Sequence, residues 1–127
     1  GSLYHAQAAA DVLEGEGVSV ELIDPRTLVP LDSDSIVKSV AKTGRLVVVD
    51  PANRTCSAAS EIAAIVADEA FDSLKAPIRR VTTPNIPIPF SPPMEKPLYP
   101  NKDRILAAVR EVAGYAQSGR RPGHAVD

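Results

Sequence analysis

The residues whose types could support catalysis are few and scattered. The two histidines, His5 and His124, lie near opposite ends of the chain, and no Ser, Asp or Cys stands directly beside either of them. Because a catalytic triad needs converging partners, we assign neither histidine a catalytic role. Asp32 and Asp34 form a carboxylate pair, but they open an amphipathic stretch, where acidic residues typically cap a helix. The sequence therefore predicts no catalytic residue.

Cys56 is the single cysteine and follows Arg54 at the start of a predicted helix. A helix N-terminus and a nearby cation both lower a thiol pKa, so a reactive cysteine is one interpretation. A small residue packed beneath a loop is the other, which we favour because no partner base is evident. A single cysteine excludes an internal disulfide and a cysteine-built zinc site, and it suggests a cytoplasmic protein.

Cofactor, nucleic-acid and membrane binding also find no support. The sequence has no P-loop and no GxGxxG motif after a strand, and we predict no cofactor-binding or metal-binding residue. Its 127 residues hold 14 basic and 16 acidic side chains, which argues against nucleic-acid binding. No apolar run is long enough to span a bilayer.

Helices and strands alternate along the predicted chain. In order, we expect a helix over Leu3–Glu14, a strand over Val18–Asp24, a helix capped by Asp32, a strand over Leu46–Val49, a helix over Ser57–Ala70, a strand over Ile78–Thr82 and a helix from Lys102. The Leu46–Val49 strand is apolar at every position, which is typical of a strand covered on both faces. This order predicts a three-layer α/β/α fold with a mainly parallel sheet.

Eight of the 12 prolines fall between Pro77 and Pro100. The proline-rich segment Thr83–Pro100 is expected to contain neither a helix nor a central strand. The alternation of Ile86, Ile88 and Phe90 within it suggests packing against this domain or against a partner. We expect one domain over residues 1–113 and a flexible tail over 114–127, which is rich in Gly, Arg and Pro.

Four motifs in order resemble the C-terminal domain of transketolase-like proteins. They are DPRTLVPLD over residues 24–32, TGRLVVV over 43–49, APIRRV over 76–81, and PIPF over 87–90 followed by Glu95. Residues 1–112 are similar in particular to the beta subunit of thiamine-diphosphate-dependent 2-oxo acid dehydrogenases. The stretch from Arg54 to Ser57 is similar to acetoin dehydrogenase beta subunits, except that Thr55 intervenes.

The resemblance implies an assembly role. In this family thiamine diphosphate and magnesium bind between the alpha subunit and the beta subunit's N-terminal domain, so this chain alone would hold no cofactor and be inactive. The C-terminal domain contacts its own N-terminal domain, its mate in a beta–beta homodimer, and the lipoyl acyltransferase. Arg26, Ile88, Phe90 and Glu95 are our subunit-contact candidates. Alternatively, Arg26 braces its own loop by binding loop carbonyls.

Three functions follow as hypotheses. The first is the subunit-contact domain of an acetoin, pyruvate or branched-chain 2-oxo acid dehydrogenase, an oxidoreductase within a multienzyme complex. The second is the same domain of a transketolase or a deoxyxylulose-phosphate synthase type of transferase. The third is a free-standing α/β interaction module with no catalytic partner.

The resemblance also implies a strand that this sequence lacks. The family's first strand runs directly into the first helix and lies between the strands that correspond to residues 18–24 and 46–49. Gly1 and Ser2 stand where that strand would end. We therefore expect the ordered form to need an upstream segment, or a strand from another chain, in that position.

Overall fold

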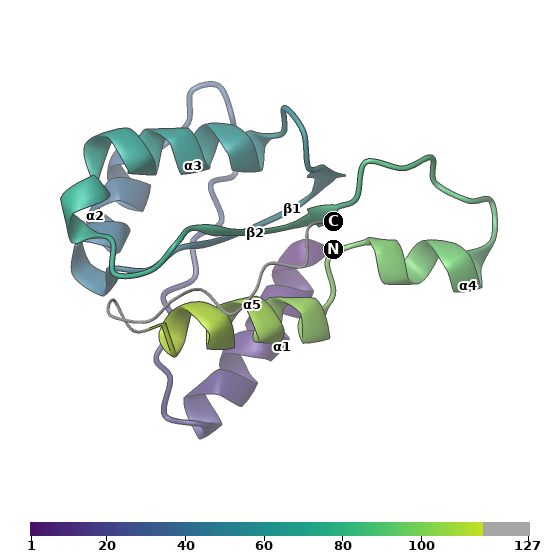
Figure 1. The fold of residues 1–127 in the computed structure, drawn as a ribbon, viewed down its shortest axis with the longest axis horizontal. Helices are drawn as coiled ribbons and strands as arrows, with labels where there is room; N and C mark the ends of the chain where they lie inside the picture. The colour runs from purple at the N-terminus through teal and green to yellow at the C-terminus, as the bar shows by residue number, and fades with distance from the viewer. Residues whose placement is uncertain (116–127) are drawn as a thin grey trace.

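The computed structural model describes residues 1–115 as helices packed around a short parallel sheet (Figure 1). The helices are α1 (Ser2–Gly15), α2 (Ser33–Thr43), α3 (Ala58–Glu69), the short α4 (Pro92–Glu95) and α5 (Lys102–Ala113), with 3-10 turns η1 (Phe71–Ser73) and η2 (Lys96–Leu98). The strands are β1 (Val47–Asn53) and β2 (Arg79–Thr83). Apart from residues 18–24, this order confirms the predicted alternation of elements.

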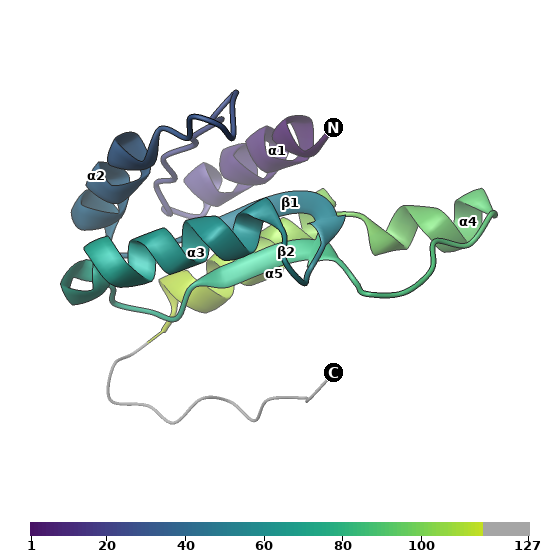
Figure 2. The ribbon, with the colours of Figure 1, turned by 90° about the horizontal axis from the view of Figure 1, so that it is seen from above.

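The two strands pair in parallel, with Val47 opposite Arg79 and Asp50 opposite Thr82. The register then shifts, so that Asn53 faces Thr83. A parallel pair must be joined by a crossover, and α3 supplies it. The arrangement is an α/β fold with helices on both faces of the sheet, as the sequence predicts (Figure 2).

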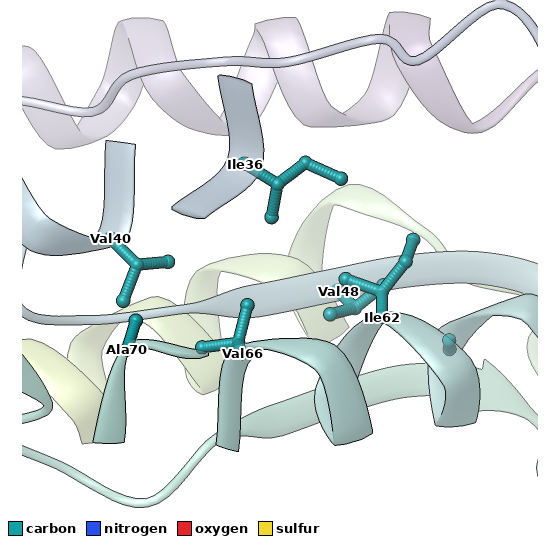
Figure 3. Close-up of a cluster of buried hydrophobic side chains, with 7 residues drawn as sticks. Ile36, Val40, Val48, Ile62, Val66 and Ala70 are labelled. Carbon is teal, nitrogen blue, oxygen red and sulfur yellow. The ribbon is translucent and has the colours of Figure 1, made fainter. Parts of the chain in front are cut away.

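One hydrophobic cluster fills the space between β1, α2 and α3 (Figure 3). Val48 is the strand's contribution, and Val40 and Val66 are almost completely buried between the two helices. The members of the cluster are Ile36, Val40, Val48, Ala59, Ile62, Val66 and Ala70. Because aliphatic side chains of this size bury well and carry no polar atom, this cluster stabilises the layer mainly through the hydrophobic effect.

A second cluster lies on the opposite face, beneath α1 and α5. Ala9 and Leu13 of α1 meet Ile105 and Leu106 of α5 over Val81 of β2. Val47 and Val49 pack against this cluster while Val48 faces the other one. The alternation of side chains along a strand therefore connects the two helical layers.

Local sequence signals set the helix boundaries. The Asp32 carboxylate accepts hydrogen bonds from the backbone N–H of Ser35 at 3.1 Å and from its hydroxyl at 2.6 Å, and these bonds hold the pKa of Asp32 below its usual value. Gly44 ends α2 at φ 74°, and a Cβ there would lie 3.1 Å from the Ser73 carbonyl oxygen. Only glycine fits both demands.

Residues 18–24 correct one prediction. They lead from α1 toward α2 as an irregular segment with no strand. The sheet formed by residues 1–115 contains only β1 and β2, so residues 18–24 belong to no sheet. The apolar run Leu46–Val49, whose last three residues begin β1, is also less covered than predicted: Val48 is buried, but Leu46, Val47 and Val49 are only half-buried. Both departures arise at the same edge of the sheet.

The proline-rich segment corrects another prediction, since α4 and η2 lie within it. Pro92 and Pro93 occupy the first turn of α4, where a missing backbone N–H costs nothing because no carbonyl precedes it in the helix. The predicted absence of a central strand in this segment agrees with the observed sheet.

Candidate subunit-contact surface

Residues 84–99 form an arm that leaves the end of β2, projects beyond the helical layers and returns to α5 (Figures 1 and 2). The arm carries α4 and η2 and includes three of the four predicted contact residues, Ile88, Phe90 and Glu95. It contacts the rest of the domain mainly at its two ends, and each end is held by specific hydrogen bonds.

The outgoing end of the arm is tied to the loop after β1. The Asn85 side-chain amide donates to the Thr55 hydroxyl at 2.5 Å, and its carbonyl oxygen accepts from the Thr55 backbone N–H at 3.2 Å. Just before the arm, the buried Thr83 hydroxyl donates to the Pro51 carbonyl at 2.7 Å. The arm therefore leaves from a fixed point.

Arg104 of α5 holds the returning end. Its guanidinium donates through Nη1 to the Leu98 carbonyl at 2.9 Å and through Nη2 to the Thr82 carbonyl at 2.6 Å. Partial burial lowers the pKa of Arg104 from its usual value. One side chain thus ties the end of the arm to the end of β2.

The apolar side chains of the arm are exposed rather than packed on this domain. Phe90 is fully exposed, and Ile86, Ile88 and Met94 are 47%, 41% and 63% exposed. The alternation of Ile86, Ile88 and Phe90 suggested packing either against this domain or against a partner. Because all three side chains are exposed, packing against this domain is wrong. A cluster of exposed apolar side chains on a projecting element is typical of a protein-contact surface.

Glu95 braces the arm internally. Its carboxylate accepts a hydrogen bond from the Tyr99 hydroxyl at 2.7 Å, across one helical turn. Ionisation of Tyr99 would lose this bond and place two negative charges together, so the pKa of Tyr99 is raised. Glu95 therefore shapes α4, and the residue as a whole is half-buried.

Arg26 lies elsewhere, in the connection between α1 and α2, which both views place apart from α4 (Figures 1 and 2). Its guanidinium pairs with Asp24 at 3.0 Å, its side chain is 83% exposed, and its φ is 56°. The predicted bracing of the loop thus uses the Asp24 carboxylate and not loop carbonyls. The structure does not bring Arg26 together with the arm.

The other candidate reactive residues occupy unrelated positions. Cys56 is exposed just before α3, so the packed interpretation of this residue is wrong, and its φ of 56° places it in a left-handed turn. His5 lies on α1 with its ring edge-on to Tyr4. His124 and the predicted tail over 114–127 lie outside the described residues, except for Gly114 and Tyr115.

The donor set does not suit the cofactor that the resemblance implies. Among residues 1–115, no three His, Cys, Asp or Glu side chains are grouped so that they could hold a metal ion. The described residues therefore offer no grouped set of ligands for magnesium. Within the same range, no helix has both the length and the apolar character needed to cross a membrane.

Sequence reasoning missed part of the exposed apolar surface. Leu28 and Val29 are 58% and 93% exposed in the connection before α2, and Phe71 is 70% exposed on η1. The sequence could have indicated Leu28 and Val29, because they are two consecutive apolar residues in the loop between Thr27 and Pro30. An isolated Phe71 after a helix carries no such signal.

The fold and its exposed arm define a class of protein. The sequence model of the transketolase C-terminal domain matches residues 1–105, and the chain belongs to this family. A solved split-gene transketolase, an inactive beta4 tetramer, has the same fold, with a TM-score of 0.74 and 22% identity over 87% of this chain and 35% of that one.

Curated relatives narrow the class to particular subunits. The beta subunit of an acetoin:2,6-dichlorophenolindophenol oxidoreductase from Bacillus subtilis is 48% identical over 86% of this chain and 32% of its own length. The beta subunit of 2-oxoisovalerate dehydrogenase from the same species is 39% identical over 89% and 35%. The pyruvate dehydrogenase E1 component subunit beta of Rickettsia felis is 42% identical over 85% and 33%. The chain thus spans about a third of these relatives.

Proposed function

We propose that residues 1–113 form the subunit-contact domain of the beta subunit of a thiamine-diphosphate-dependent dehydrogenase. The similarity to three such beta subunits supports this assignment. The observation that carries the contact role is the arm, whose two ends are anchored by Asn85 and Arg104 while its apolar side chains face outward. Within this proposal the holoenzyme binds the cofactor outside these residues and works in the cytoplasm.

Acetoin is the first substrate to test, because the acetoin oxidoreductase subunit shares more identical residues with this chain than the two other relatives named above. The test is to combine the full-length beta subunit with its alpha subunit and to measure reduction of 2,6-dichlorophenolindophenol. Acetoin, pyruvate and 2-oxoisovalerate are compared at equal concentration. Faster reduction with either 2-oxo acid would contradict the acetoin assignment.

The transferase alternative has weaker support. Likeness to the solved transketolase at 22% identity establishes the shared fold alone. The free-standing module is disfavoured because the matched relatives are about three times the length of the region that they share with this chain.

The contact partners form part of the proposal. The arm would contact a second beta subunit in a homodimer, and the remaining surface would face the beta subunit's own N-terminal domain, the alpha subunit and the lipoyl acyltransferase. Arg26 and Glu95 would contribute charged groups at the edges of these contacts, because both keep partly accessible charges beside apolar neighbours.

Phe90→Ala tests the arm directly in the full-length beta subunit. Because Phe90 is fully exposed, its removal should leave the melting temperature of the 127-residue chain unchanged while weakening self-association of the full subunit. Burial of a Phe contributes about 1.5–3 kcal/mol, so we expect a dissociation constant at least about tenfold higher by analytical ultracentrifugation.

Phe71→Ala is the matched control, because Phe71 is also an exposed aromatic residue but lies on η1, outside the arm. It should change neither quantity. Equal self-association of the Phe90→Ala variant and the unmodified subunit would contradict the contact role of the arm.

A further inference from the structure

Both sulfur-containing side chains of the chain are exposed to solvent. The 127 residues contain one methionine and one cysteine, Met94 and Cys56. Met94 is 63% exposed on α4, and Cys56 is exposed just before α3. A peroxide oxidises an accessible thioether directly, whereas a thiol must first lose its proton. Met94 is therefore the more readily oxidised of the two.

Met94 lies in the apolar surface of the arm. Its backbone N–H donates to the Ser91 carbonyl at 3.0 Å, which places it in the first turn of α4, four residues after Phe90. Phe90 and Ile88 are exposed on the same arm. A flexible and polarisable thioether adapts to irregular apolar surfaces, so it suits a contact between proteins. Met94 therefore belongs with the arm side chains that a partner would cover.

The backbone around Met94 has few hydrogen-bond donors to spare. Pro92 and Pro93 have no N–H group, and the N–H groups of Met94 and Glu95 both bond to the Ser91 carbonyl, at 3.0 and 2.8 Å. A sulfoxide oxygen at this position would therefore take its hydrogen bonds from water. A partner that covered the arm would remove that water, and burying an unpaired polar oxygen is unfavourable.

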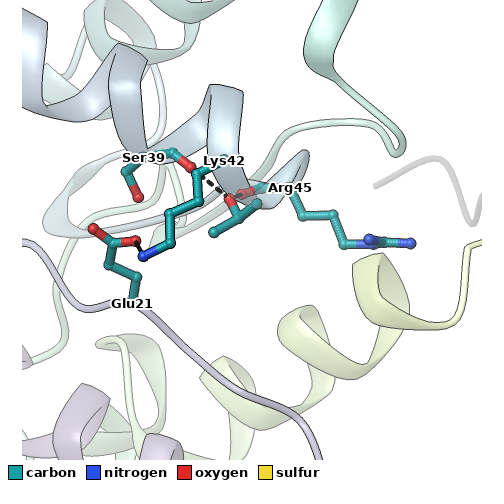
Figure 4. Close-up of polar contacts among 5 residues, drawn as sticks. Glu21, Ser39, Lys42 and Arg45 are labelled. Atoms are coloured by element: carbon teal, nitrogen blue, oxygen red, sulfur yellow. Dashed lines mark hydrogen bonds and ion pairs between the residues drawn. The ribbon is translucent and has the colours of Figure 1, made fainter.

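Oxidation at this position would leave the rest of the domain intact. Neither hydrophobic cluster of residues 1–115 includes a residue of α4. The ends of the arm are held by Asn85 and Arg104 through hydrogen bonds that do not involve Met94. The polar contacts near the end of α2, where Lys42 donates to the Glu21 carboxylate at 3.2 Å, also join other segments (Figure 4). The effect of oxidation is therefore expected at the contact surface and not in the stability of the fold.

We propose that Met94 is a redox-sensitive modification site that controls whether the arm makes its contact. A peroxide transfers one oxygen atom to the Met94 sulfur: the O–O bond breaks, an S–O bond forms, and the sulfur loses two electrons while the peroxide is reduced to water or, if organic, to an alcohol. A dithiol reverses the change, becoming a disulfide while the oxygen leaves as water. This inference rests on the proposed function, because it needs the arm to be a contact surface.

Contact and oxidation exclude each other at this site. In the separate subunit the Met94 side chain is open to peroxide, whereas a partner on the arm would cover it. Oxidised subunits would therefore assemble poorly, and assembled subunits would be protected. Oxidation of Met94 should accordingly be at least about fivefold slower at subunit concentrations above the dissociation constant than below it, because susceptibility follows exposure.

The test compares the full-length beta subunit with its Met94→Leu variant, each carrying Cys56→Ser so that this thiol cannot respond. Both proteins are treated with hydrogen peroxide, the oxygen added at Met94 is measured by peptide mass spectrometry, and self-association is measured by analytical ultracentrifugation. We expect the dissociation constant to rise at least about fivefold when Met94 is present and to stay unchanged in the Met94→Leu variant. Methionine sulfoxide reductase with a dithiol should restore the original value.

Met94→Gln is a control that needs no oxidant, because it places a polar amide where the sulfoxide would stand. It should weaken self-association to a similar extent and leave the melting temperature unchanged. Met94→Leu keeps an apolar side chain of similar size, so without peroxide it should associate as the unmodified subunit does.

Three outcomes would overturn the inference. Equal weakening by peroxide with and without Met94 would place the sensitive group elsewhere. Complete oxidation of Met94 with unchanged self-association, while Phe90→Ala still weakens it, would contradict the switch and leave the contact role of the arm standing. Unchanged self-association of both Met94→Gln and Phe90→Ala would contradict the contact role itself, and the switch with it.

Discussion

Asp32 shows how one side chain fixes the position of a helix. The pair of acceptor oxygens on its carboxylate satisfies the Ser35 backbone N–H and the Ser35 hydroxyl, and the ionised form is favoured by both bonds. Its neighbour Asp34 lies in the first helical turn, where negative charge suits the positive end of the helix dipole. The carboxylate pair is therefore used for capping, as its sequence position suggested.

We predict that Asp32→Ala lowers the melting temperature at pH 7, because the start of α2 loses its cap. The pKa of Asp32 is lower in the folded protein than its ordinary value of 3.8. The stabilisation is therefore fully present above that value and is lost as the pH falls through the folded pKa. Thermal unfolding of both proteins between pH 7 and pH 2 should show the gap narrowing in the acid range. A gap independent of pH would contradict an ionised cap.

At the scale of elements, the arm depends on a cation in α5. Arg104 is the point where the end of β2, the end of the arm and the start of α5 meet, because two carbonyls from separate segments accept from one guanidinium. The helix begins beside it, with Asn101 as the cap that accepts from the Arg104 backbone N–H at 3.0 Å. The arm is therefore held by the same residues that start the last helix.

Arg104→Ala should destabilise the domain by about 1–3 kcal/mol, because the Leu98 and Thr82 carbonyls lose a charged donor. Chemical denaturation of the 127-residue chain measures this loss, and amide exchange across residues 84–99 should increase. Lys102→Ala, an exposed change in the same turn of α5, is the control and should stay within about 0.5 kcal/mol of the unmodified chain. An equal effect of both changes would refute the anchoring role.

At the scale of the whole molecule, two apolar clusters lie on opposite faces of a two-stranded sheet. Such a small sheet leaves β1 exposed along one edge, and a cavity lined in part by residues 18–25 and 45–49 lies beside that edge. The projecting arm adds a second incomplete surface at another place. Two unsatisfied surfaces on one domain are consistent with a part of a larger assembly.

We expect the 127-residue chain to bind neither thiamine diphosphate nor magnesium with micromolar affinity, because its described residues provide no suitable donor set. Titration calorimetry with both ligands together measures this. The reconstituted alpha and beta subunits serve as the positive control. Micromolar binding to the chain alone would place a cofactor site here and contradict the assignment of a contact domain.

Much of the fold could be predicted from local patterns. Helical spacing located α2, α3 and α5, because the side chains that repeat every three or four residues are those that become buried. The ordered motifs from residue 24 to Glu95 indicated the family, which the match over residues 1–105 confirms. Short-range chemistry such as the Asp32 cap also follows from neighbours in the sequence.

Tertiary structure decided which apolar groups are covered. The pattern of Val18 to Asp24 is typical of a strand, yet a strand needs a partner, and residues 1–115 provide none at that edge. The alternation of Ile86, Ile88 and Phe90 is the same whether these residues face a core or solvent. Cys56 likewise stands beside a helix start in the sequence, but the left-handed turn exposes it. Sequence period determines which face of an element is apolar, whereas long-range packing determines what, if anything, lies against that face.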